Sequence, residues 1–82
     1  MAKTEYRLCM IEVLFFGRMV DAAGMRHTSL PHSEGLRLSD IRVRLLPDMD
    51  GVRMSVNKVQ VVGDQALHDG DEVAFFSVFS GG

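Results

Sequence analysis

The sequence closes on two glycines, Gly81 and Gly82, followed by a carboxylate. At a background glycine frequency of roughly 7%, a chain ends in this pair by chance about once in two hundred cases. Glycine has no Cβ, so an acyl group on Gly82 is unhindered and the backbone can pass through a narrow channel. The pair is a candidate for acyl chemistry at the carboxylate, and the alternative is a frayed terminus without a role.

The histidines and the cysteine do not form a metal-binding pattern. His27, His32 and His68 have no metal-ligand spacing, so we expect surface residues and no metal site. Cys9 is the single cysteine, lies in an apolar segment and cannot form an internal disulfide. This cysteine usage fits a reduced, intracellular setting.

The acidic cluster near the end of the chain is typical of a turn. Asp69, Asp71 and Glu72 lack the spacing of an EF-hand, and Asp-Gly-Asp is ordinary turn chemistry, so we expect no cation site. The sequence also offers no Ser-His-Asp or Cys-His arrangement for nucleophilic catalysis. We therefore expect that the chain has no active site of its own.

Composition predicts one globular domain. A chain of 82 residues can bury only about 60% of its unfolded surface, which leaves nothing for a second core. The net charge of −2, without a basic stripe, argues against nucleic-acid binding. The apolar run at residues 8–16 is too short to span a bilayer and has neither a clear basic leader nor a cleavage site, so we expect a cytoplasmic protein.

Alternating hydrophobicity predicts the first strand. From Cys9 to Phe15 every odd position is apolar, whereas the even positions include Glu12, which indicates one buried face and one half-apolar face. Residues 17–24 suit a short helical turn. Residues 25–30 read as a weak second strand that ends before proline.

The segment before Pro47 fits both a strand and a helix. Alternation around Ile41 favours a strand, whereas Leu38, Ile41 and Leu45 share one helical face. We choose a helix that is capped by Ser39 and closed by Pro47. The arginines expected on its surface, in contact with solvent, are Arg37, Arg42 and Arg44.

Three further strands are predicted at residues 52–57, 58–62 and 72–79. The order of elements indicates an α+β fold, with one main helix across one face of a mixed sheet. The first and last strands are the most apolar, so we expect them side by side in the centre, with the chain leaving at the edge of the sheet.

The last predicted strand leads into the end of the chain. Val73 and Phe75 share one parity and Phe76 the other, so an inward Val73 leaves Phe76 exposed. Phe76 then either packs under a loop or belongs to an interaction surface.

Three stretches, "IEVLFFG", "SVN" and "LHDGDEVAFFSVFSGG", resemble the small, sulfur-carrying subunit of molybdopterin synthase, a ubiquitin-like β-grasp protein. The resemblance covers most of residues 11–82 and is weakest at 25–50. The organisation we expect is an N-terminal extension (1–10) leading into the first strand, a β-grasp domain (11–76) and an extended tail ending in Gly-Gly (77–82).

The resemblance implies that the Gly82 carboxylate is adenylated by a ubiquitin-activating-type enzyme that uses ATP. Sulfur from a persulfide donor protein then displaces the adenylate, and the resulting thiocarboxylate on Gly82 attacks a cyclic pterin precursor in the large synthase subunit. The chain is expected to bind no cofactor and to be the non-catalytic subunit of a heterotetramer. Gly81 keeps the tail slim, and the residues implied to contact partners are Phe76, Ser77, Val78, Phe79 and Ser80. That family often carries two prolines where this chain has Ser77 and Val78.

Three alternatives to this interpretation stay open. They are a sulfur carrier for thiamine synthesis, a ubiquitin-like modifier that joins a lysine amine through Gly82, and an interaction domain with an inert tail. The "EVAFF" strand and the length of the chain argue against the thiamine carrier.

Overall fold

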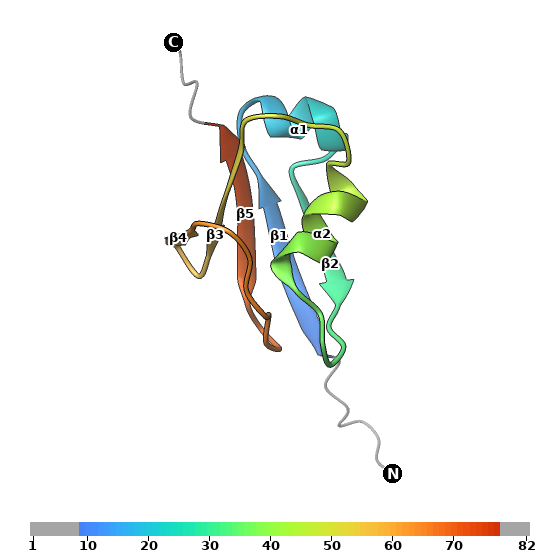
Figure 1. Ribbon diagram of the computed structural model, residues 1–82. Helices are drawn as coiled ribbons and strands as arrows, with labels where there is room; N and C mark the ends of the chain where they lie inside the picture. The colour runs from blue at the N-terminus through green and yellow to red at the C-terminus, as the bar shows by residue number, and fades with distance from the viewer. Residues whose placement is uncertain (1–8, 78–82) are drawn as a thin grey trace.

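Five strands form one mixed sheet in the order β2-β1-β5-β3-β4 (Figure 1). The structure is a computed structural model and describes residues 9–77. The β1–β5 pair is parallel and the other three pairs are antiparallel. The elements in chain order are β1 (Met10–Phe15), α1 (Arg18–Ala23), β2 (His27–Pro31), α2 (Leu38–Leu45), β3 (Val52–Val56), β4 (Val59–Val61) and β5 (Glu72–Ser77).

The first and last strands lie side by side in the middle of the sheet, as their apolar sequences predicted. Phe15 is opposite Phe75 in the parallel register, and their rings stack with centroids 5.7 Å apart. β5 is the middle strand, and Ser77, its last residue, pairs with Val52 of β3. The expected exit of the chain at the edge of the sheet falls on residues 78–82, outside the described residues.

The alternation of β1 produces the predicted buried face, with one exception. Ile11 and Val13 are fully buried and Phe15 nearly so, whereas Cys9 is exposed. Cys9 precedes the first residue of the strand, so the sheet no longer directs its side chain into the core. The expectation that Cys9 continues the apolar face is therefore wrong.

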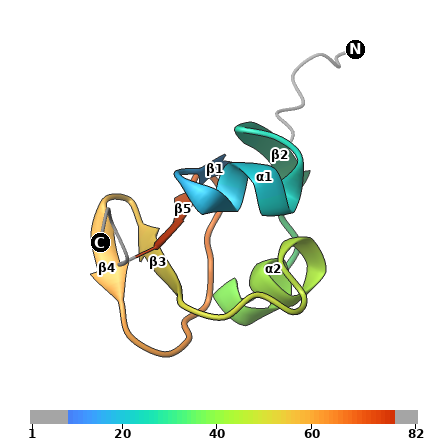
Figure 2. The ribbon, with the colours of Figure 1, turned by 90° about the horizontal axis from the view of Figure 1, so that it is seen from above.

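Both helices lie on the same side of the sheet (Figure 2). Leu38 and Ile41 of α2 and Met19 of α1 join the strand residues in one buried cluster. Val43 is 63% exposed. A strand would have placed Val43 on the same face as Ile41, so the helix was the right choice between the two sequence patterns.

Asp64 caps the N-terminus of α2, and the predicted cap at Ser39 is wrong. The Ser39 N–H donates to Asp64 Oδ1 at 2.8 Å, and the Ser39 hydroxyl donates to Asp64 Oδ2 at 2.9 Å. Arg37, the residue at the N-cap position, donates its Nε–H to Asp64 Oδ2 at 2.9 Å. These bonds, above all that of Arg37 and then that of the Ser39 backbone, hold the pKa of Asp64 well below its usual range.

Two of the three arginines expected to be merely solvated therefore make specific contacts. Besides Arg37, the half-buried Arg42 donates to the carbonyl oxygen of Met49 in the loop that follows α2. Arg44 is exposed, as expected. Neither helix of the described residues is long and apolar enough to cross a membrane.

Candidate functional site

The candidate site is the C-terminal end of β5, at Phe76 and Ser77. Val73 and Phe75 are fully buried, and Phe76, of the opposite parity, is half-buried on the other face of β5. The parity assignment is therefore confirmed, although Phe76 is less exposed than expected. The other predicted site residues lie outside the described residues, and they are Val78, Phe79, Ser80, Gly81 and Gly82.

Phe76 belongs to an apolar area on the side of the sheet that faces away from α2, which we call the open face. Leu14 of β1 pairs with Ala74 of β5, and both side chains are half-buried. Phe16 is 51% exposed, and its N–H donates to the Phe75 carbonyl oxygen at 3.0 Å. We define Leu14, Phe16, Ala74 and Phe76 as the apolar patch.

Leu14 and Phe16 belong to this patch although neither was predicted from the sequence as a site residue. The signal was available in "VLFFG", because Leu14 and Phe16 have the parity opposite to the buried residues of β1. A parallel pairing of the first and last strands then brings both residues beside Phe76. Only the register of the two strands establishes that neighbourhood.

Charge is distributed unevenly over the open face. At the end far from the tail, Glu12 of β1 is aligned with Glu72 of β5. Glu12 accepts hydrogen bonds from His27 Nε2 and from the Ser29 hydroxyl, and these bonds, that of His27 first, lower the pKa of the Glu12 carboxyl. At the tail end, the exposed Arg53 of β3 pairs with Phe76. The apolar patch therefore borders a cation, and the carboxylates lie at the other end.

Cys9 is far from the C-terminal end of β5. Phe15 of β1 is opposite Phe75 of β5 in the parallel register. Cys9 precedes Phe15 by six residues, and Ser77 follows Phe75 by two residues. At roughly 3.3 Å per residue, about 26 Å separates their positions along the sheet. The arrangement does not bring Cys9 and the start of the tail together.

The other candidate residues have structural contacts. His27 and His68 are exposed as expected, whereas His32 is half-buried and its Nε2 bonds the Leu67 carbonyl oxygen at 2.9 Å, so the surface assignment is wrong for His32. Asp71 Oδ2 accepts the His68 N–H at 2.8 Å, which is the predicted turn chemistry. Within residues 9–77, no group of His, Cys, Asp or Glu side chains has the arrangement of a metal site.

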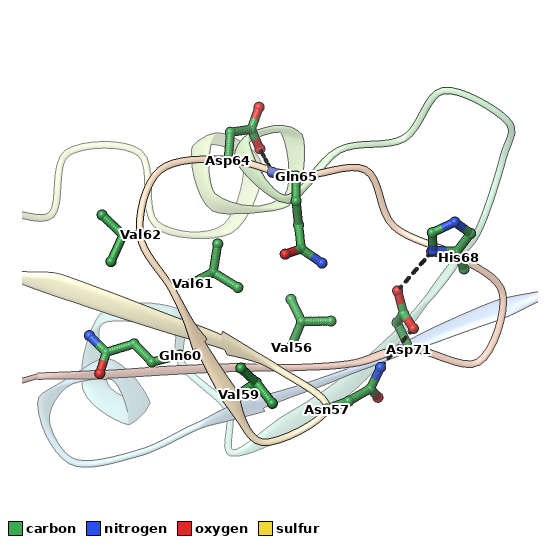
Figure 3. A pocket seen from close by; sticks show the side chains of 10 residues that line it. All are labelled: Val56, Asn57, Val59, Gln60, Val61, Val62, Asp64, Gln65, His68 and Asp71. Atoms are coloured by element: carbon green, nitrogen blue, oxygen red, sulfur yellow. Dashed lines mark hydrogen bonds and ion pairs between the residues drawn. The ribbon is translucent and has the colours of Figure 1, made fainter.

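A groove of about 540 Å³ lies beside the β3–β4 hairpin (Figure 3). Valines of the hairpin, including Val56 and Val61, form its apolar wall. The two acidic residues of its lining are already engaged, since Asp64 caps α2 and Asp71 Oδ1 accepts the Asn57 side-chain amide at 2.9 Å. The groove therefore presents no convergent set of unused charged groups for a ligand.

Comparison with known proteins identifies the family. A model described as the ThiS family matches residues 13–82, well over half of the sequence. The chain belongs to the ThiS family. No curated protein sequence matches it.

Solved structures of other proteins share the fold of this ThiS-family chain. SAMP1 from Haloferax volcanii superposes with a TM-score of 0.70 at 23% identity, covering 89% of this chain and 99% of that chain. Urm1 from Trypanosoma brucei gives a TM-score of 0.70 at 24% identity, and the match covers 94% of this chain and 99% of that chain. A Pyrococcus furiosus protein provisionally described as molybdopterin converting factor, subunit 1, gives a TM-score of 0.68 at 25% identity, and the match covers 83% of this chain and 95% of that chain.

The expected fold is confirmed, because this ThiS-family chain has the β-grasp, ubiquitin-like architecture of the matched structures. The family resemblance drawn from the sequence is confirmed at the level of ubiquitin-like sulfur carriers and modifiers. The molybdopterin synthase subunit is a finer prediction than these matches support.

Proposed function

We propose that this ThiS-family chain carries sulfur as a thiocarboxylate on Gly82 and delivers it to a cyclic pterin precursor for the molybdenum cofactor. The observation that supports the proposal most directly is the position of the apolar patch beside the last residue of β5, directly before the Gly-Gly segment. A partner that docks on the apolar patch would also bind the start of the tail, at Ser77. Five residues remain after Ser77, and when extended they reach about 16 Å into that partner.

The chemistry proceeds through an activated carboxylate. An oxygen of the Gly82 carboxylate attacks the α-phosphorus of ATP in the activating enzyme and pyrophosphate leaves, giving an acyl adenylate. The outer sulfur of a donor persulfide attacks the acyl carbon and AMP leaves. A second thiol then cleaves the acyl disulfide, becomes oxidised to a disulfide with the donor, and leaves the thiocarboxylate on Gly82.

The chain itself supplies the acyl group and the docking surface. The partners in this proposal are the adenylating enzyme, the persulfide donor and the large synthase subunit, whose residues perform the catalysis. The resemblance to a molybdopterin converting factor at 25% identity supports the choice of pathway. Transfer of the same thiocarboxylate to a thiamine precursor is the alternative within the ThiS family.

A modifier is the second candidate function, because an activated Gly82 carbonyl can also acylate a lysine amine. The two functions leave different products: a sulfur carrier returns with a carboxylate, whereas a modifier stays joined to its target by an isopeptide bond. Ladders of conjugates that contain this chain would support the modifier.

Intact-mass analysis of the protein purified from its own cells tests the proposal. We expect a fraction whose mass corresponds to replacement of one oxygen by sulfur, and fragmentation should place the change at Gly82. Incubation with the large subunit and the cyclic pterin should return this fraction to the carboxylate while the pterin gains sulfur. A protein that never carries sulfur, even after incubation with its activating enzyme and a persulfide donor, would contradict the proposal.

A further inference from the structure

The two lateral edges of the sheet differ in how they can pair with another strand. At the β2 edge, the His32 N–H donates to the Cys9 carbonyl oxygen, so the preceding residue, Pro31, has its backbone nitrogen on the outer side. Proline has no N–H, and such a residue on an edge strand prevents pairing with a further strand. The β2 edge is therefore protected.

The β4 edge has no proline of this kind, and Lys58, directly before the strand, is the single charged residue of residues 58–62. Val59 is 68% exposed and Val62, directly after the strand, is 89% exposed. These are two of the five large hydrophobic residues that the described part of the chain exposes. Neither a proline nor an acidic residue occupies residues 58–62.

The backbone of Gln60 is directed toward solvent at this edge. The Asn57 N–H donates to the Glu72 carbonyl oxygen of β5 at 2.8 Å, so the backbone groups of Asn57 point toward β5. Successive residues of a strand direct these groups to opposite sides. The backbone N–H and C=O of Val56 therefore point toward its partner Val59 of β4. Gln60, the residue after Val59, consequently directs its N–H and C=O away from β3.

We propose that β4 is a self-association edge, at which two copies of this chain pair antiparallel about a two-fold axis at Gln60. The two Gln60 residues then exchange two backbone hydrogen bonds. A two-fold interface uses the same surface on both copies, so each side-chain pair in it occurs twice. The two sheets become one continuous sheet, with the open face of each copy still uncovered.

The register makes the edge complementary to itself. With Gln60 opposite Gln60 of the second copy, Val59 lies opposite Val61 of that copy, and both side chains are on the face that lines the groove. Cross-strand pairs of β-branched residues stabilise a sheet. Lys58 lies opposite Val62 of the second copy, two residues before Asp64, so a cation approaches a carboxylate and no like charges are opposed.

The short length of β4 determines how strong this association can be. A strand of three residues buries less than the roughly 1,200–2,000 Å² of a stable interface. We therefore expect a monomer at about 10 μM and a substantial dimer population near 1 mM, that is, a Kd of about 0.1–1 mM. This proposal is independent of the proposed function, because the apolar patch lies on β1 and β5 and is not part of the β4 edge.

Sedimentation velocity of the full chain at about 10 μM to 1 mM tests the proposal. Gln60→Pro removes the outward N–H without removing a bond between β3 and β4, and should lower the association constant at least tenfold. Gln60→Ala is the matched control, which keeps the N–H and should associate like wild type. Lys58→Glu places a carboxylate opposite Val62 and so nearer to Asp64 of the second copy, and it should weaken association several-fold.

Amide NMR spectra over the same concentrations locate the contact. We expect concentration-dependent shifts at Gln60 and Val62, with Phe16 and Phe76 unchanged. A wild-type chain that stays monomeric near 1 mM overturns the proposal, as do shifts that occur at the patch instead. If Gln60→Pro disturbs the hairpin, unchanged association of the folded Lys58→Glu variant overturns the two-fold register.

Discussion

The Phe75 ring stacks on the Phe15 ring across the central parallel pair, with centroids 5.7 Å apart and an interplanar angle of 22°. The next residue, Phe76, lies on the opposite face of β5. Two adjacent phenylalanines thus have different surroundings. One joins the two middle strands in the core, and the other belongs to the apolar patch.

Phe75→Ala and Phe76→Ala should therefore separate stability from binding. Phe75→Ala leaves a cavity in the core and should cost about 3–5 kcal/mol of unfolding free energy. Phe76→Ala should cost less stability but about 2 kcal/mol or more of binding to the large subunit, roughly thirtyfold in affinity. Denaturant unfolding and titration calorimetry measure the two effects. Unchanged binding of the Phe76→Ala variant, or equal destabilisation by both variants, would contradict the assignment.

Acid should weaken the cap of α2. The folded-state pKa of Asp64 is depressed, so its stabilising effect is complete above the ordinary aspartate pKa of about 4 and is lost as the pH falls below that value. Asp64→Asn should lower the melting temperature at pH 7 and flatten its fall between about pH 4 and 2. Asp48→Asn, an exposed aspartate in the turn after α2, is the control. If both variants keep the wild-type acid profile, Asp64 does not cap the helix in solution.

Cys9 should not take part in sulfur transfer, because the sheet separates it from the start of the tail. Cys9→Ser should deliver sulfur to the pterin at the wild-type rate in a reconstituted assay with the activating enzyme and the persulfide donor. The thiocarboxylate should form on Gly82 in both proteins, as measured by intact mass. A folded Cys9→Ser protein that forms the adenylate but receives no sulfur would make Cys9 a carrier residue.

The last two residues should be indispensable for activation. One residue appended after Gly82 moves the carboxylate and should abolish adenylate formation. Gly81→Ala should reduce adenylation and transfer because a Cβ restricts the backbone and thickens the tail. The buried core of the described residues extends from Ile11 to Phe75, so we expect unfolding free energies within about 0.5 kcal/mol of wild type. If the extended protein still forms the adenylate and delivers sulfur, the Gly-Gly end is an inert terminus.

Much of the fold could be predicted because its signals are local. The alternation at β1 and β5 identified the buried faces and assigned Phe75 and Phe76 to opposite sides of the strand. The helical spacing of Leu38 and Ile41 located α2, although a strand pattern competed with it. The Gly-Gly end with the turn and strand before it indicated the family, since those residues are contiguous in the sequence.

The sequence by itself therefore determined the main elements and their inward faces. Only the tertiary structure decided that Asp64 caps a helix 25 residues away, that His32 bonds Leu67, and that Leu14 and Phe16 lie beside Phe76. It also decided which strand edge is protected. The physical reason is that these contacts depend on the register and path of strands distant in sequence, whereas hydrophobic periodicity reports only what each segment does along its own axis.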